Sequence, residues 1–125
     1  MTQQEIQERN KQIALMLNIK IEQCYPENKD YKQHGVVYTL EKEFAKNVNS
    51  IFLGVSELKF HKDWNWLMEA IEFIDKSRYD IIIARQSCSI WTGGTCHIDG
   101  ESVFKKEAVF IAVSDFAQKL NNKEL

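Results

Sequence analysis

Cysteine and histidine are the side chains with which this 125-residue chain could do chemistry, as metal ligands or as a nucleophile and its base. They are Cys24, Cys88, Cys96, His34, His61 and His97. Structural zinc sites usually contain ligand pairs such as C-x-x-C, and the nearest grouping here, Cys88, Cys96 and His97, has none. A two-residue turn at 93–94 would also point Cys96 and His97 to opposite faces of a strand, with Trp91 opposite Cys96 and Ile90 opposite His97. We therefore expect no metal site.

A catalytic pair of cysteine and histidine, for example Cys88 with His61, is the second candidate. The sequence offers no recognisable nucleophile turn and no glycine-rich loop for an oxyanion. The "TGGT" stretch at 92–95 lacks the longer glycine spacing of a phosphate loop and is typical of a turn between strands. We therefore predict no catalytic residue, no cofactor and no enzyme activity. If the chain is an enzyme nonetheless, its candidate residues are His61, Cys88, Cys96 and His97.

Hydrophobic periodicity and turn residues predict the elements that position these side chains. Helices are predicted over 3–17, 62–77 and about 103–121, and strands over 19–25, 36–40, about 51–55, 79–91 and 95–98. Residues 41–57 are expected to form a short turn or helix followed by one of these strands. Hairpin-length connections favour a mostly antiparallel sheet. We predict a single α+β domain, residues 1–125, in which three helices pack on a small sheet in the order α-β-β-(β)-α-β-β-α.

Polar residues mark two helix starts. Asp63 stands in or just before the first turn of the central helix, where a carboxylate suits the helix dipole. The "DGES" stretch at 99–102 is expected to end the sheet, with Ser102 or Asp99 capping the final helix.

The central helix carries apolar residues on two stripes of its surface. One stripe consists of Trp64, Leu67, Met68, Ile71 and Ile74. The other consists of Trp66, Ala70 and Phe73, which leaves a narrow polar arc. So wide an apolar surface favours a helix buried between the sheet and neighbouring helices. We expect Trp64 to anchor the core and Trp66 to be packed under a neighbour, with an exposed Trp66 as the alternative that would indicate a partner.

The final helix repeats this pattern and supplies further binding candidates. Beside its core stripe it has a second stripe with Phe104, Ala108 and Ile111. The two extra stripes could pack together, form a homodimer surface or bind another protein. The candidate binding residues are Trp66, Phe73, Phe104 and Ile111.

Composition excludes several classes of protein. Hydrophobic residues make up 44% and charged residues 27% of the chain, as in an ordinary globular domain. The formal net charge is −2 and the chain has no long run of charges of one sign. The sequence therefore does not indicate a domain that binds nucleic acid by itself. No apolar run reaches about 18 residues and the start lacks an apolar signal segment, so we expect a cytoplasmic protein with reduced thiols.

Three short blocks resemble a group of small proteins of Bacteroidetes phages and prophages. The first is N-x-x-I-A at Asn10–Ala14, and the second is an aromatic-His-x-x-W-x-W-L-M block at Phe60–Met68. The third is a K-x-E-A-V-x-x-A-V block whose last residue is Val113, in a helix that ends near an asparagine. A proline often follows the W-L-M block in that group, where this chain has Glu69 and Ala70. The blocks cover about a third of the chain.

The resemblance implies a phage origin and an accessory role in the host cell. Small phage accessory proteins are often inhibitors, so it implies a non-enzymatic inhibitor of host defence, with an anti-CRISPR protein acting on an RNA-guided effector or its guide RNA as the specific expectation. The expected partner is a host protein or ribonucleoprotein complex. Direct contact with nucleic acid and pairing of two copies are left open. The alternatives are a structural or self-assembling phage protein, and an enzyme with an unrecognised Cys/His site.

Overall fold

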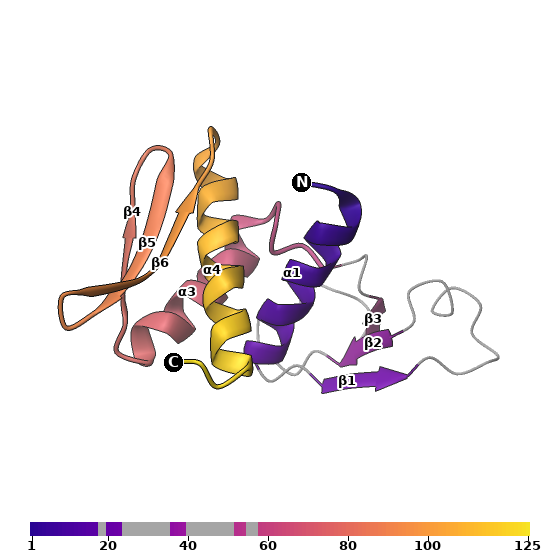
Figure 1. Cartoon of the computed structure of the whole chain (residues 1–125). Helices are drawn as coiled ribbons and strands as arrows, with labels where there is room; N and C mark the ends of the chain where they lie inside the picture. Colours follow the sequence, from indigo (N-terminus) through magenta and orange to yellow (C-terminus); the bar gives the residue numbers. More distant parts are fainter. Residues whose placement is uncertain (18–19, 24–35, 40–51, 55–57) are drawn as a thin grey trace.

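The computed structural model describes residues 1–17, 20–23, 36–39, 52–54 and 58–125. Within these residues the chain is an α+β protein, as predicted, with helices and antiparallel strands in the order α-β-β-β-α-β-β-β-α (Figure 1). The helices are α1 (Gln3–Met16), α3 (Trp64–Lys76) and α4 (Lys105–Asn121). None of the described helices is long and apolar enough to cross a membrane.

The first sheet consists of β1 (Lys20–Gln23), β2 (Val36–Thr39) and β3 (Phe52–Gly54), and both of its pairings are antiparallel. The predicted pairing of the first two strands is confirmed, as is a strand within residues 51–55. The turn or helix expected from residue 41, and the segment with Cys24 and His34, lie outside the described residues.

The second sheet consists of β4 (Asp80–Ile83), β5 (Ser87–Thr92) and β6 (Thr95–Glu101), with β5 in the middle. The predicted long strand over 79–91 is wrong, because the chain reverses after β4. The Ala84 N–H donates to the Ser87 carbonyl over 2.8 Å and closes this turn. The strands that the structure describes therefore form two small sheets where one was predicted.

The second hairpin of this sheet turns at two glycines with positive φ, Gly93 at 52° and Gly94 at 83°. This geometry matches the right-handed twist of paired strands. Trp91 pairs with Cys96, as predicted, but a bulge follows and Ile90 pairs with Ile98 instead of His97.

The sheet does not end at "DGES" because β6 runs on to Glu101, against α4. Gly100 makes this close approach possible. A Cβ atom at this position would lie 2.8 Å from the Ala108 carbonyl oxygen and 2.9 Å from the Ala112 nitrogen. Only glycine fits there without displacing the helix.

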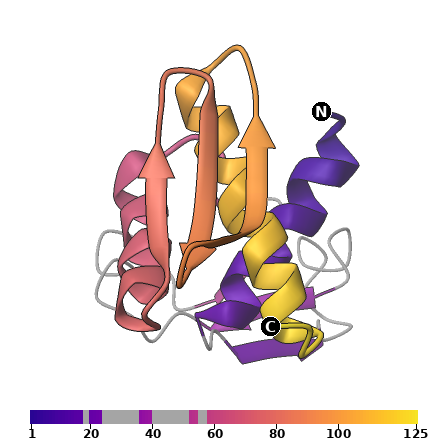
Figure 2. The same ribbon diagram turned by 60° about the vertical axis from the view of Figure 1, so that its left-hand side comes forward.

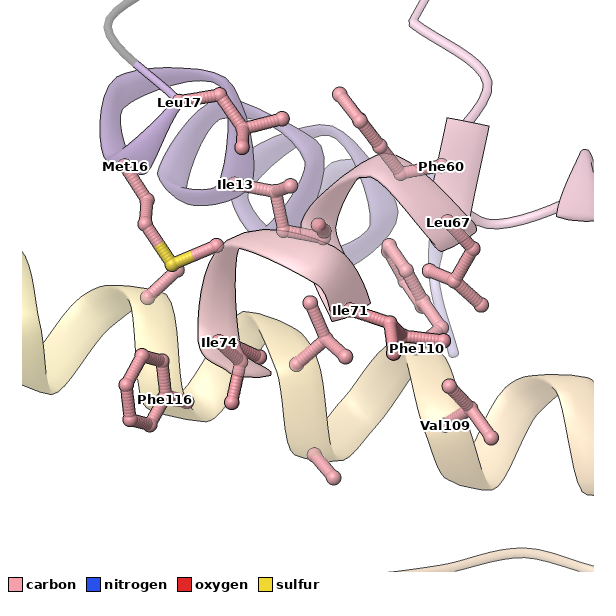
Figure 3. Packing of buried hydrophobic residues seen from close by; sticks show 14 of the residues in the cluster. Ile13, Met16, Leu17, Phe60, Leu67, Ile71, Ile74, Val109, Phe110 and Phe116 are labelled. Carbon is pink, nitrogen blue, oxygen red and sulfur yellow. The ribbon is translucent and has the colours of Figure 1, made fainter. Parts of the chain in front are cut away.

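Helices α3 and α4 cover one face of the β4–β6 sheet, and α1 packs beside α4 (Figures 1 and 2). The side chains between these elements form one apolar cluster. Figure 3 shows that α1 contributes Ile13, α3 contributes Leu67 and Ile74, and α4 contributes Phe110 and Phe116 to the same space. The core therefore depends on residues from both ends of the chain.

Helix α3 is closed at both ends by local hydrogen bonds. Asp63 is its N-cap, as predicted, and its Oδ1 accepts from the Asn65 N–H over 2.8 Å. At the other end Arg78 has φ of 70°, and the Tyr79 N–H reaches the Ile74 carbonyl over 3.3 Å. This left-handed ending turns the chain directly into β4.

Helix α4 begins later than predicted and without a side-chain cap. The expectation that Ser102 or Asp99 caps it is wrong. Ser102 Oγ accepts from the Phe104 N–H over 3.2 Å, so the hydroxyl bonds a residue that precedes the helix. Asp99 lies within β6, paired with Ser89.

The two tryptophans of α3 differ in burial. Trp64 is 38% exposed and Trp66 is 5% exposed, so the expectation that Trp64 anchors the core is wrong and the packed Trp66 is confirmed. The burial of Trp66 is explained by Phe60, whose ring packs edge-to-face on that of Trp66 with centroids 5.1 Å apart. Phe60 is itself fully buried, and it closes the flank of α3 that carries Trp66.

Candidate binding surface

His61 lies just before α3, half-buried between α1 and α4. Its Nδ1 is 3.0 Å from the Asn10 amide nitrogen, and its ring centroid is 6.0 Å from that of Phe110. Burial lowers the pKa of His61 below its usual value, and the charges of Lys62 and Lys106 lower it further. A neutral imidazole bonded to a buried amide is typical of a residue that holds the fold.

The two described cysteines lie on opposite faces of the β4–β6 sheet, as predicted. Cys88 is buried, and desolvation followed by the charge of Asp99 raises its pKa to about 12. Cys96 is exposed, and its thiol donates to the Ile98 carbonyl over 3.2 Å. Cys88, buried and with a raised pKa, lacks the electropositive and accessible surroundings of a reactive cysteine.

His97 occupies the bulge of β6 and makes its own set of contacts. Its Nε2 is hydrogen bonded to the Thr92 hydroxyl, and its ring meets Tyr79 edge-to-face with centroids 5.7 Å apart. Tyr79 in turn packs edge-to-face on Phe116. His61, Cys88, Cys96 and His97 thus have separate partners, and no hydrogen bond joins any two of these four residues. Among the residues that the structure describes, no group of three or more His, Cys, Asp or Glu side chains could hold a metal ion.

The predicted binding residues are not brought together as one surface. Trp66 is buried and is thereby removed as a surface contact. Phe73 is half-buried against the core cluster. Ile111 is also half-buried, facing α1, and its carbonyl accepts from Arg9 and from Ser114. Phe104 alone remains strongly exposed, at 70%.

Phe104 belongs to an exposed patch at the start of α4. Its neighbours Val103, at 75%, and Lys105 are exposed, and Lys62 is exposed just before α3. Lys106 joins the two helix starts, because its Nζ donates to the Lys62 carbonyl over 3.0 Å. We call Val103, Phe104, Lys62 and Lys105 the apical patch. The sequence indicated Phe104 through its helical stripe but gave no signal for Val103, which precedes the helix.

The apical patch is held in place by backbone hydrogen bonds. The Ser102 N–H donates to the Gln86 carbonyl over 3.0 Å, which ties the end of β6 to the turn between β4 and β5. Both features lie at the same end of the molecule (Figure 2). Together with the bond from Phe104 to Ser102, this contact fixes the backbone from which Val103 and Phe104 project.

A second group of exposed apolar residues follows the β4 edge. It consists of Ile82 and Ile83, while Trp64 and Met68 are exposed on the neighbouring helix α3. By contrast, two hollows on the described surface are open and lined mainly by polar side chains, one of them by His97, Asp99, Asp115 and Lys119. They lack the enclosed apolar lining of a small-molecule site.

Comparison of the chain with known protein families, with curated proteins and with solved structures gave no match.

Proposed function

We propose that this protein is a non-enzymatic binding protein that acts by occupying a surface of a larger macromolecule. The observation that carries the proposal is the apical patch, where Phe104 and Val103 project into solvent at the start of α4. Aromatic side chains are enriched at binding hot spots, and burying one fully on a partner gives a large gain in free energy.

The rigidity of the patch supports this role. Ordering a flexible loop costs free energy on association, so a preformed contact surface binds more tightly. Here the backbone beside Phe104 is already held by the Ser102 bonds to Gln86 and Phe104. Lys62 and Lys105 at the rim favour a partner with negative charge around an apolar centre.

The more specific proposal is inhibition of an RNA-guided defence complex of the host, as in an anti-CRISPR protein. It depends on the resemblance to Bacteroidetes phage proteins. Several residues of the resembling blocks are structural: Asn10 bonds His61, and Phe60 packs on Trp66. These residues hold the fold of this chain and do not contact a target, so the target is proposed only from the phage origin that the resemblance implies.

A cleavage assay with a purified RNA-guided effector from a Bacteroidetes host tests the proposal. We expect inhibition to be complete near one copy of the chain per effector and not to increase with incubation time, because a binder does not turn over. Inhibition at a small fraction of one copy, growing with time, would indicate an enzyme. Absence of inhibition at excess protein contradicts the proposed target.

Two single substitutions test whether the apical patch is the surface that contacts the effector. Phe104→Asp should abolish inhibition, because a charge replaces the exposed aromatic ring. Leu125→Asp introduces the same charge at an exposed apolar residue at the other end of α4 and should inhibit like wild type. Equal inhibition by both variants contradicts the role of the apical patch.

The alternative of a self-assembling phage protein is favoured by one observation, the exposed apolar edge of the second sheet.

A further inference from the structure

Strand β4 forms an open edge of the second sheet. In the part of the chain that the structure describes, β4 pairs with β5 alone, in the order β4-β5-β6. Ile82 is 54% exposed and Ile83 is also exposed, although isoleucine is normally buried. Natural sheets usually protect such an edge with lysine, proline or a bulge. Residues 80–83 contain neither lysine nor proline, and the irregularity of the sheet lies at Ile90 and Trp91, between the other two strands.

The hydrogen-bonding groups of this edge can be assigned from the turn that follows it. Since the Ala84 N–H bonds to Ser87, the backbone groups of residues 82 and 80 also point toward β5. The N–H and C=O groups of Ile81 and Ile83 therefore point to the open edge. Ile81 and Ile83, one on each side of Ile82, therefore present their backbone donors and acceptors to a further strand.

Helix α3 adds apolar side chains beneath this edge. The helix leads through a tight turn into β4 and runs antiparallel to it, so the first half of α3 lies beside the end of the strand (Figure 2). Trp64 and Met68 are four residues apart and share one flank of the helix. Trp66 and Phe73 lie on the opposite flank, where Trp66 meets Phe60. Ile83 points to the face of the sheet that α3 covers, because it pairs with the buried Cys88, whereas Ile82 points to the opposite face.

We propose that two copies of this chain pair antiparallel through their β4 strands, around a twofold axis at Ile82. In this register Ile81 of each copy faces Ile83 of the other and exchanges backbone hydrogen bonds with it. The two Ile82 side chains meet across the axis on the outer face. The two three-stranded sheets become one sheet of six strands, with the Ile83 side chains on the face that carries both α3 helices.

The charges at the ends of the strand favour a second copy over an unrelated partner. Asp80 begins the strand and Arg85 follows its end, and both are exposed. Antiparallel pairing brings Asp80 of each copy near Arg85 of the other, so opposite charges enclose the apolar centre on both sides. Arg78 lies outside the strand, in the turn that ends α3.

Solution mass, measured by light scattering over a series of concentrations, tests the proposal directly. We expect wild type to have twice the mass of one chain at micromolar concentration and Ile82→Lys to have half that value, with an unchanged circular dichroism spectrum. Phe104→Asp should leave the mass doubled, so loss of dimerisation and loss of inhibition are separable. A wild-type protein that stays monomeric, or a dimer that survives Ile82→Lys, overturns the proposal.

A disulfide trap tests the register even if Ile82→Lys folds poorly. In a background of Cys24→Ser, Cys88→Ala and Cys96→Ser, the variant Ile82→Cys should cross-link two copies under mild oxidation, because directly opposed residues at a twofold axis are close enough for a disulfide. Ser89→Cys is the matched control, since Ser89 faces Ile82 from the middle strand and lies away from the edge. Equal cross-linking of the two variants, or none with Ile82→Cys, contradicts the pairing.

Discussion

The side-chain amide of Asn10 donates to Nδ1 of His61 over 3.0 Å, joining two residues that are 51 positions apart. The same amide nitrogen lies 3.3 Å from the Leu58 carbonyl, which fixes the orientation of the amide because a carbonyl can only accept. Nδ1 of His61 must therefore accept, so the folded state holds the neutral ring with its proton on Nε2. Asn10 is almost fully buried, and its Oδ1 has no partner among the described residues.

This relationship predicts a loss of stability in mild acid. The pKa of His61 is lowered in the folded protein, by burial first and then by Lys62 and Lys106, from 6.5 in the unfolded chain. As the pH falls below 6.5, the unfolded chain takes up the proton before the folded protein does. The stabilisation due to the neutral ring is thus complete above pH 6.5 and is lost as the pH falls through the folded pKa.

Urea unfolding at pH 7.5 and pH 5.5 measures this effect. The free energy of unfolding should decrease between these pH values in wild type, and by less in His61→Gln, which has no titrating group there. An equal decrease in the two proteins would show that other groups cause the pH dependence. Lys106→Met should raise the pKa of His61 in an NMR titration, because it removes one of the charges that lower it.

The tryptophan pair of α3 predicts unequal losses of stability. Trp66→Ala leaves a cavity against Phe60 and should cost about 3–5 kcal/mol. Trp64→Ala removes a partly exposed ring and should cost about 1 kcal/mol. Urea unfolding of both variants in the Ile82→Lys background checks this without a contribution from self-association. Equal losses would contradict the burial difference.

Local signals in the sequence predicted the α3 boundaries, its Asp63 cap and the glycine turn, because each depends on neighbouring residues. The expectation that Trp64 anchors the core was wrong, because a helical wheel shows where the apolar stripes lie but not which of them another segment of the chain covers. Phe60 precedes the helix, and its packing on Trp66 determines which of the two tryptophans is buried. The β4–β5 turn was missed because Ala84, Arg85 and Gln86 include no residue typical of turns.

The candidate surfaces were only partly predictable for a related reason. Phe104 was indicated by its position on a helical stripe and is exposed. Ile82 and Ile83 were predicted only as part of a strand, and nothing in the sequence indicated their exposure, since a run of isoleucines is typical of the interior. Their exposure follows from the position of β4 at the sheet edge, which depends on strand order and not on local pattern.

The two described cysteines should differ strongly in reactivity. Raising the pKa of Cys88 to about 12 from 9.0 lowers its thiolate fraction at pH 8 about a thousandfold. Cys96 is exposed and should be alkylated first. Site-resolved mass spectrometry after brief treatment with iodoacetamide, in a Cys24→Ser background, measures this order. In urea both cysteines should react alike, and rapid alkylation of Cys88 in the native protein would contradict its burial.

The approach of β6 to α4 predicts that the smallest change at Gly100 is destabilising. In Gly100→Ala the new methyl group would lie 2.8 Å from the Ala108 carbonyl and 2.9 Å from the Ala112 nitrogen. Both atoms are helix backbone and cannot rotate away, so the sheet and α4 must separate, at a cost of about 1–3 kcal/mol. Asp99→Ala is the control, because Asp99 is the exposed neighbour in the same strand, and it should change the free energy of unfolding far less. Ala112→Gly combined with Gly100→Ala should not restore stability, since it leaves both backbone contacts in place. Restoration by that second change would show that the Ala112 methyl group, 3.1 Å from the new Cβ, is the real obstacle.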